Sequence, residues 1–419
     1  CVLMRILLVG AGGVGEAFCA IASKRSFIES IMVADIDLAK AQRVAARDSR
    51  YSACELDASS AAAVSAAAIA CRAELVMNAA DPRFVMGIFN GAFEAGVHYM
   101  DMAMSISSVH SERPTELCGV KLGDLQFEQS AQWQERELLA LCGMGIEPGI
   151  ADVFAKHASD ELFSEIHEVG IRDGANMTVR GYDFAPTFSI WTVIEECLNP
   201  PVIWERDRGW FTTPPFSQPE IFRFPEGIGD VECVNVEHEE VLLVPRWIDC
   251  NRVTFKYGLG DEFIAVLETL HKLGLDGTEP VTVRGAKVSP RDVVAACLPD
   301  PASLGDRIEG KTCAGTWVTG LGKAAAGAAP APREVYLYHV VDNEWSMKNY
   351  GDQAVVWQTA INPVIAMELL NRGTWKPEGI NGPEWFAAKP FLDLLEEYGT
   401  SWHVREESSA GISVEELAI

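Results

Sequence analysis

Long hydrophobic runs are absent from this sequence of 419 residues, and no apolar segment approaches the roughly 20 residues that a membrane-spanning helix needs. The first residues also lack a basic stretch followed by a long apolar one, so we expect no secretory signal. Hydrophobic residues nevertheless make up 48% of the chain, which is ample for a buried core. At this length two domains are the default expectation.

Basic residues are scarce: 34 Lys and Arg stand against 60 Asp and Glu, a formal net charge of −26. Such a surface repels phosphate backbones and anionic lipid headgroups. We therefore expect neither a nucleic acid nor a membrane as a partner.

Clustered cysteines are also missing, since the 11 cysteines are scattered singly and no CxxC pair occurs. This usage indicates reduced thiols in a cytoplasmic protein rather than a disulfide framework or a zinc site. The sequence has no HExxH segment, phosphate-binding P-loop or Ser-His-Asp order. We expect no metal site.

Glycines are concentrated near the start of the chain, where Gly10, Gly12, Gly13 and Gly15 follow an apolar run at residues 4–9. The first glycine permits a tight turn, the second lets backbone amides approach a pyrophosphate, and the last lets helix and strand pack closely. The helical segment expected from Glu16 to Ala22 presents free N–H groups and a positive dipole end to phosphates at its start. The pattern predicts a dinucleotide-binding turn.

An acid lies 20 residues beyond Gly15, where Asp35 closes a second apolar run at residues 30–34. An acid at this place accepts hydrogen bonds from the adenosine ribose hydroxyls and repels a 2′-phosphate. Ile36 and Asp37 follow without an adjacent arginine that would attract one. The sequence favours NAD over NADP as the cofactor.

Strand and helix patterns alternate over the first 145 or so residues, which predicts a parallel, doubly wound α/β sheet of the Rossmann type. Ligands bind such sheets at the carboxyl ends of the strands. Asp57 ends the third expected strand, Asn78 ends the fourth, and Ala79 and Ala80 then allow close approach of a ligand. A polar helical stretch at about 115–136 leads to the sixth expected strand. The predicted cofactor residues are Gly10, Gly12, Gly13, Val14, Gly15, Asp35, Ile36, Asp57, Asn78, Ala79 and Ala80.

Two acids at strand ends are the catalytic candidates. Asp101 follows the fifth expected strand, and Glu147 precedes Pro148 and Gly149 after the sixth. Amine oxidation needs a group that takes a proton, and carboxylates at the cofactor edge suit that role. The alternative role for either acid is to cap a loop or a helix, and the sequence leaves both roles open.

The character of the sequence changes after Gly149, because residues 165–259 are rich in strand patterns, turns and aromatics. We expect residues 1–149 to form the cofactor domain, 150–345 a second α+β domain, and 346–419 a mainly helical C-terminal segment.

Several segments, taken in order, resemble the saccharopine dehydrogenase-like family; they are residues 10–15, 78–82, 94–101, 145–150, 313–318, 338–343, 353–359 and 390–395. The resemblance implies a second domain that binds substrate and forms a homodimer interface, with C-terminal helices returning to the first domain. It also implies NAD(P)-dependent transfer between an amine and an imine of an amino acid or amine. The alternatives are a homospermidine synthase or carboxynorspermidine dehydrogenase-like polyamine enzyme, and a non-catalytic NAD-binding regulator.

The sequence leaves the charge of the substrate pocket open. Arginines that suit a substrate carboxylate are Arg172, Arg180, Arg246 and Arg252. Acids and aromatics that suit a polyamine are Asp173, Asp183, Trp191 and Glu195.

Overall fold

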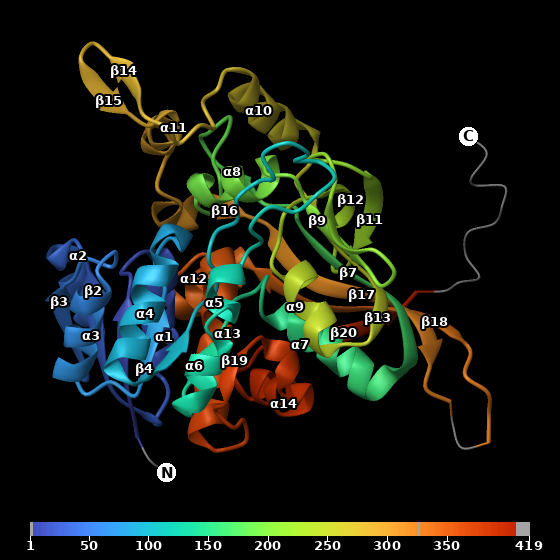
Figure 1. Cartoon of the computed structure of the whole chain (residues 1–419), viewed down its shortest axis with the longest axis horizontal. Helices are drawn as coiled ribbons and strands as arrows, with labels where there is room; N and C mark the ends of the chain where they lie inside the picture. Colours follow the sequence, from blue (N-terminus) through green and yellow to red (C-terminus); the bar gives the residue numbers. More distant parts are fainter. Residues whose placement is uncertain (1–2, 325–326, 408–419) are drawn as a thin grey trace.

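The computed structural model describes residues 3–324 and 327–407, which build two sheets packed side by side (Figure 1). The first sheet and its helices contain the N-terminal part of the chain, and the second sheet lies beside it, as Figure 1 shows. No described helix is both long and apolar enough to cross a membrane.

The first sheet has seven strands, all parallel, in the order β19-β6-β5-β4-β1-β2-β3. Its core strands are nearly continuous apolar runs, as expected for a parallel sheet covered on both faces. The doubly wound α/β fold predicted from the sequence is therefore confirmed. The strands are β1 (Met4–Val9), β2 (Ile28–Asp35), β3 (Tyr51–Glu55), β4 (Leu75–Asn78), β5 (His98–Met100), β6 (Leu139–Leu141) and β19 (Gly379–Asn381).

Local sequence signals start the crossover helices of this sheet. Asp37 accepts hydrogen bonds from the amides of Ala39 and Lys40, and Ser60 accepts one from Ala63, so each side chain satisfies N–H groups in a first helical turn. The helices are α1 (Gly13–Ala22), α2 (Leu38–Ala45), α3 (Ala61–Ala70) and α4 (Val85–Ala95).

The predicted helix at 115–136 is wrong in its first half. Only α5 (Asp124–Phe127) and α6 (Ser130–Glu135) are helical there. Gly119 packs so tightly that a Cβ would lie 2.1 Å from the carbonyl oxygen of Ser108, and Gly123 has a φ of +77°. These two positions favour an irregular loop over a helix.

The second sheet has nine strands and is mixed, with its long strands in the order β10-β9-β13-β7-β17-β18-β20. The pair β13 and β7 is parallel, while β17 is antiparallel to both β7 and β18. The strands are β7 (Phe163–Ala175), β9 (Val202–Glu205), β10 (Gly209–Thr212), β11 (Glu220–Phe224), β12 (Gly229–Asn235), β13 (Cys250–Gly258), β17 (Lys311–Gly322), β18 (Pro332–Asp342) and β20 (Trp402–Glu406).

Helices and small strands surround the second sheet. A two-stranded hairpin of β14 and β15 projects from the body beside α10 and α11 (Figure 1). The elements are α7 (Ile150–His157), β8 (Thr178–Val179), α8 (Ile190–Leu198), α9 (Glu240–Trp247), α10 (Asp261–Lys272), β14 (Val281–Val283), β15 (Ala286–Val288), α11 (Pro290–Cys297) and β16 (Ile308–Glu309).

The C-terminal segment contributes to both sheets. Helix α13 (Ala354–Asn371) packs on α1, and α14 (Ala388–Glu397) packs on α7 and α13; α12 (Asn343–Tyr350) precedes them. Between these helices β19 pairs with β6 of the first sheet, and after them β20 pairs with β18 of the second. The two strands were not predicted from the sequence. Residues 408–419 of the expected C-terminal segment lie outside the described residues.

Candidate active site

The glycine turn connects β1 to α1, and the surroundings of Gly10, Gly12 and Gly15 differ from one another. Gly10 has a φ of +110°, and a Cβ there would lie 2.4 Å from the carbonyl oxygen of Ala79. A Cβ on Gly15 would lie 2.1 Å from the carbonyl oxygen of Gly10. A Cβ on Gly12 would meet nothing within 4 Å. Gly10 and Gly15 are thus fixed by packing, whereas Gly12 faces open space.

Asp35 lies at the end of β2 and is fixed against this turn. Its Oδ2 accepts the amide of Ala11 at 2.8 Å, and its Oδ1 accepts the amide of Asp37 at 2.9 Å. The following side chain, Ile36, is 67% exposed. Neither Asp35 nor Asp57 lines the cavity described below. Asp57 accepts hydrogen bonds from Ser59, whose hydroxyl and amide lower its pKa.

The end of β4 forms the next part of the same edge. Asn78 is buried, donates to the hydroxyl of Tyr99 at 3.0 Å and accepts the amide of Ala80 at 3.0 Å. These bonds hold Ala79 and Ala80 close to Gly10, as the close approach of Gly10 to the Ala79 carbonyl requires.

A cavity of about 490 Å³ lies where this edge meets the second sheet. Six predicted cofactor residues line it, namely Gly12, Gly13, Val14, Asn78, Ala79 and Ala80. The opposite wall comes from the second sheet and from α8, with apolar contributions from Met177, Phe188, Val193, Leu259 and Phe263. The cavity therefore extends from the glycine turn into a partly apolar space between the two sheets. We call this space the chamber.

The charged lining of this chamber is acidic. Among the described residues that line it there is neither a lysine nor an arginine. Its titratable side chains are Asp81, Glu147, Asp173, Glu196, His238, Glu239, Tyr257 and Asp300.

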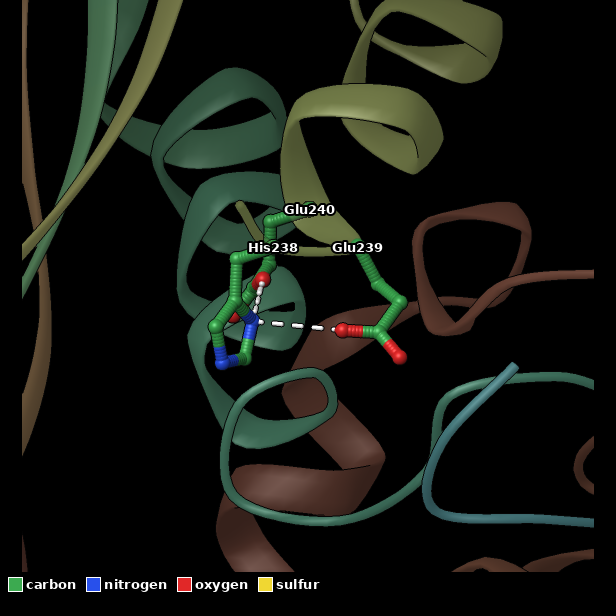
Figure 2. A group of neighbouring side chains, drawn as sticks. All are labelled: His238, Glu239 and Glu240. Atoms are coloured by element: carbon green, nitrogen blue, oxygen red, sulfur yellow. Dashed lines mark hydrogen bonds and ion pairs between the residues drawn. The ribbon is translucent and has the colours of Figure 1, made fainter. Parts of the chain in front are cut away.

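His238 is held by two glutamates that follow it in sequence (Figure 2). Its Nδ1 lies 2.7 Å from Oε2 of Glu240 and 3.4 Å from Oε2 of Glu239, and its ring stacks on Phe255 with centroids 3.9 Å apart. Burial alone would lower the pKa of His238, but Glu240, Glu196 and Glu239 more than offset it and raise that pKa to about 10. Figure 2 shows the second ring nitrogen pointing away from both carboxylates.

The donor atoms of His238, Glu239 and Glu240 lie within 4.8 Å of one another, a spacing that a cation can bridge. The hydrogen bond between His238 and Glu240 already uses the imidazole Nδ1, so we treat the group as an ion pair and assign no metal ligand set.

Glu147 lines the cavity beside Asp173. Burial raises the pKa of Glu147 well above its usual range, and the neighbouring carboxyl of Asp173 raises it further. Burial also raises the pKa of Asp173, against hydrogen bonds from Glu147 and Tyr257. Two facing carboxyls in such a place hold one proton between them.

Asp101, the other catalytic candidate, does not line the cavity. It is fully buried, with Oδ1 accepting the amide of Gly143 at 2.7 Å and Oδ2 accepting Nε2 of Gln126 at 2.8 Å. Burial raises the pKa of Asp101 to about 7. These hydrogen bonds connect the end of β5 to the loop after β6 and to α5. Such contacts are the ones that the loop-capping role predicts.

The four candidate arginines are all engaged away from the cavity. Arg172 pairs with Glu220, Arg180 with Glu309, and Arg252 with Glu205 and Glu168, while Arg246 donates to the carbonyl of Leu242 at 3.0 Å. None of them lines the chamber.

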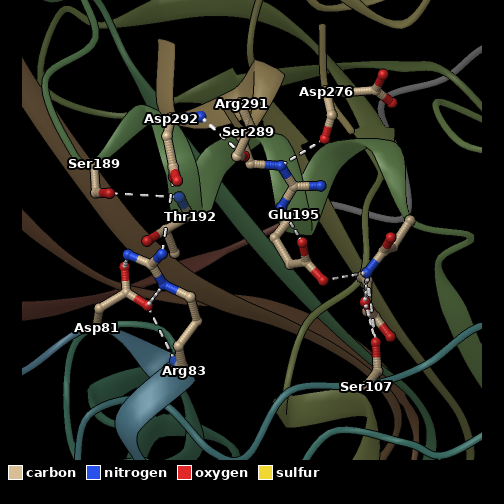
Figure 3. Close-up of polar contacts among 12 residues, drawn as sticks. Asp81, Arg83, Ser107, Ser189, Thr192, Glu195, Asp276, Ser289, Arg291 and Asp292 are labelled. Carbon is tan, nitrogen blue, oxygen red and sulfur yellow. Dashed lines mark hydrogen bonds and ion pairs between the residues drawn. The ribbon is translucent and has the colours of Figure 1, made fainter. Parts of the chain in front are cut away.

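Of the candidate acids and aromatics, Asp173 lines the chamber but Asp183 does not. Trp191 and Glu195 lie on α8 but do not line it; Figure 3 shows Glu195 with Arg291 at the rim of the chamber, in the same polar group as the lining residues Ser189 and Thr192. The guanidinium carbon of Arg83 lies 4.4 Å from the Trp191 ring centroid and that of Arg291 4.6 Å. Arg291 pairs with Glu195, and Arg83 with Asp81 at 2.8 Å, so both cations of this rim are neutralised.

Sequence reasoning missed His238, Glu239, Glu240 and Glu196. A visible signal was present: the run Val-Glu-His-Glu-Glu at 236–240 places one histidine among three acids directly after the strand β12. Because these residues belong to the mixed sheet, local periodicity does not place them beside the glycine turn.

The residues fit a pyridine dinucleotide. The space above Gly12 is open, and α1 begins at Gly13 without a side chain that caps its first amides. Free amides at a helix N-terminus suit a pyrophosphate. From this turn the cavity continues without interruption to the acids and His238.

Two family models together match most of the chain. A family model described as the saccharopine dehydrogenase NADP binding domain matches residues 6–141, and one described as the saccharopine dehydrogenase C-terminal domain matches residues 145–400.

Two relatives cover nearly the full length of the chain. Carboxynorspermidine synthase of Vibrio alginolyticus is 28% identical over 417 residues, covering 96% of this chain and 97% of that protein. Carboxyaminopropylagmatine dehydrogenase of a Synechocystis species is 27% identical over 410 residues, with the same coverage. Saccharopine dehydrogenase (L-Glu forming) of Saccharomyces cerevisiae has the same fold, with a TM-score of 0.66, 14% identity, and coverage of 97% of this chain and 100% of that one.

Proposed function

Because the chain belongs to the saccharopine dehydrogenase family and is an NAD(P)-dependent oxidoreductase of carbon–nitrogen bonds, we propose that its substrate is a polyamine-like amine conjugate. The observation that carries this proposal is the acidic chamber, which has no lysine or arginine among its described lining residues. The names of both relatives, carboxynorspermidine synthase and carboxyaminopropylagmatine dehydrogenase, fit the same class.

The acids of the chamber would hold the cationic part of the substrate. Burial raises the pKa of Glu196 to about 8 and also raises that of Glu239, although His238 lowers both. A bound ammonium or guanidinium group would restore their negative charge and replace lost solvation. The apolar side chains Met177, Val193 and Phe263 would cover the methylene chain between the charges.

His238 is our candidate for the proton transfer at the reacting nitrogen. Glu240 orients its Nδ1, which leaves the other ring nitrogen directed away from the glutamates. A cationic substrate in the same chamber would lower the raised pKa of His238 by like-charge repulsion. The imidazolium then loses its proton more easily, and the base so formed accepts the proton of the amine.

A bound pyridine nucleotide would supply the two-electron oxidation or reduction of the substrate carbon. Gly12, Gly13 and Val14 would hold its pyrophosphate, and Asn78, Ala79 and Ala80 would lie along it toward the chamber. Glu147 and Asp173, with one proton between them, would face the reacting nitrogen from the opposite wall, so that Glu147 keeps its predicted place in the site.

We propose NAD rather than NADP as the preferred cofactor, although the matching family model is described as NADP binding. Asp35 is fixed at the end of β2 by the amides of Ala11 and Asp37, and its charge opposes a 2′-phosphate at that place. Ile36 offers no cation.

The proposal is tested by mixing the purified protein with NAD or NADP and one of four substrates: carboxynorspermidine, carboxyaminopropylagmatine, saccharopine or lysine. We expect reduced cofactor to form with the first two at a kcat/KM at least tenfold above that with saccharopine or lysine. Product formed without net reduced cofactor would indicate the synthase alternative. Binding of cofactor without turnover of any amine would contradict the proposal.

We further propose that the protein is a cytoplasmic homodimer. All described cysteines are free, which fits a reducing compartment.

On the projecting hairpin, Val281 pairs with Val288 and Val283 with Ala286, so that one face is wholly apolar although Val281 and Val283 are 49% and 52% exposed. A lone two-stranded hairpin is marginal in water, and a second copy would cover this face. Light scattering of the wild type against Val283→Asp tests it, with a monomeric wild type contradicting it.

A further inference from the structure

Three carboxyl groups meet in the interior behind His238. Asp152 comes from the first turn of α7, Glu240 from the first turn of α9, and Glu384 from the short helical turn Pro383–Trp385 that follows β19. Asp152, Glu240 and Glu384 are each fully buried. Asp152 and Glu384 do not line the cavity, so they have no part in the substrate contacts described above.

The hydrogen-bonding partners of this group are few. Oδ2 of Asp152 accepts the amide of Gly149 at 2.7 Å, and the Asp152 carboxyl is hydrogen-bonded to Glu384. Neither oxygen of Glu384, nor Oδ1 of Asp152, receives an N–H or hydroxyl group from elsewhere in the described part of the chain. The nearest cation, Arg246, donates to the carbonyl of Leu242 and lies over Phe127.

Two buried carboxyls that share a hydrogen bond must hold a proton between them, because carboxylate oxygens only accept. Burial raises the pKa of both groups, and that of Glu384 lies at about 7. Oδ2 of Asp152 accepts the Gly149 amide, so the shared proton lies between Glu384 and the other oxygen, Oδ1, of Asp152.

This proton lies next to the turn that carries Glu147. Gly149 ends the turn with a φ of +144°, and its amide is the one held by Asp152. Within the turn, the amide of Gly145 donates to the carbonyl of Pro148 at 2.6 Å. Asp152 therefore fixes the end of a closed turn whose only charged side chain, Glu147, points to the cavity.

We propose that Glu384 and Asp152 are positioning residues, and that the proton they share holds Asp152 against Gly149 and so places Glu147 in the chamber. The proton also keeps a third negative charge away from Glu240, which can then serve His238. The catalytic part of this inference rests on the proposed function, whereas the shared proton does not.

Two variants of Glu384 separate a hydrogen bond from mere filling of space. In Glu384→Gln the amide N–H replaces the carboxyl O–H and still donates to Asp152. In Glu384→Met the volume is similar but no donor remains. With the amine substrate we expect kcat to fall at least tenfold in the Met variant and to stay within threefold of wild type in the Gln variant, with cofactor affinity unchanged in both. Equal kcat in the two variants would overturn the proposal.

The proton itself is tested without turnover. Infrared spectra at pH 7 should show a protonated-carboxyl band in the wild type that is missing from Glu384→Gln, and identical spectra would overturn the inference. Hydrogen exchange at the Gly149 amide should accelerate in the Met variant but not in the Gln variant. If the wild type turns over no amine but these two results are obtained, the proposed function fails and the shared proton stands. Misfolding of the Met variant leaves the infrared comparison decisive.

Discussion

His238 differs from the other buried groups of the site in having both a fixed and a free side. Glu240 and Glu239 hold Nδ1, Phe255 covers one ring face, and the remaining nitrogen points away from the carboxylates. A side chain held in this way loses little freedom when substrate binds, and that is the requirement for efficient proton transfer.

Replacing His238 should therefore impair chemistry and leave the cofactor site intact. We expect His238→Gln to lower kcat by about 10²- to 10⁴-fold, because the proton-transfer group is lost. Steady-state kinetics with the amine substrate measures this, and fluorescence titration with the cofactor should give an unchanged Kd. His167→Gln, at an exposed histidine near the start of β7, offers the matched control. A kcat for His238→Gln within threefold of wild type would remove His238 from the mechanism.

Cofactor choice is also decided by single residues. Asp35→Ser combined with Ile36→Arg removes the negative charge at the end of β2 and supplies a guanidinium for a 2′-phosphate. We expect the ratio of kcat/KM for NADP over NAD to rise by at least about 100-fold, or roughly 2.7 kcal/mol. Unchanged affinities for both nucleotides would show that the ribose acid is misplaced. Asp207→Ser, in the exposed turn between β9 and β10 of the second sheet, is the matched control.

The glycine turn shows how one element combines two different demands. Gly15 is fixed by the carbonyl of Gly10, whereas the space around Gly12 is open. Gly15→Ala should cost about 1–3 kcal/mol of unfolding free energy through overpacking. Gly12→Ala should leave stability unchanged within about 0.5 kcal/mol and weaken cofactor binding about tenfold or more, since its methyl group occupies the space over the turn. Denaturant unfolding and cofactor titration of both variants measure this contrast. Equal losses of unfolding free energy and of cofactor affinity in the two variants would contradict it.

Elements with strong local patterns were predictable, and those without were not. The strands β1, β2 and β4 and the turn at Gly12 follow from apolar runs, glycines and the acid at Asp35. The strand β19 has only three residues, Gly379–Asn381, and no periodicity that distinguishes it from a loop. Its pairing with β6 is set by tertiary packing.

Only the cofactor side of the candidate site was predictable, because the dinucleotide-binding turn is a local sequence pattern. The residues around Gly12 and Asn78 were found because a dinucleotide turn has a defined spacing. Glu196 comes from α8 and His238 from the loop between β12 and α9, and both approach Glu147 only through the mixed sheet. No local feature of the sequence encodes that approach, so neither residue was predicted.

At the scale of the whole molecule, the acidic chamber makes stability depend on pH. The folded state raises the pKa of His238 from 6.5 to about 10, so its contribution is complete below pH 6.5 and is lost as the pH rises through 10. Glu196 is raised from 4.5 to about 8, and its neutral form is favoured by folding, so stability also falls as the pH rises toward 8. We expect the unfolding free energy to decline between pH 6.5 and 10.

Two variants test which side chains cause this decline in the unfolding free energy. His238→Gln should flatten the unfolding free energy between pH 6.5 and 10, and Glu196→Gln should flatten it below pH 8. Denaturant unfolding at a series of pH values measures both slopes. A wild-type unfolding free energy that rises over this range would contradict the raised pKa of His238.

The pairing of β19 with β6 and of β20 with β18 has a consequence for how the molecule is made. The ribosome releases residues 4–141, which build six strands of the first sheet, long before Gly379 emerges. Glu384, which we place beside the turn of Glu147, follows five residues later, and β20 follows last of all. One outermost strand of each sheet is therefore added only after nearly the whole chain has been synthesised.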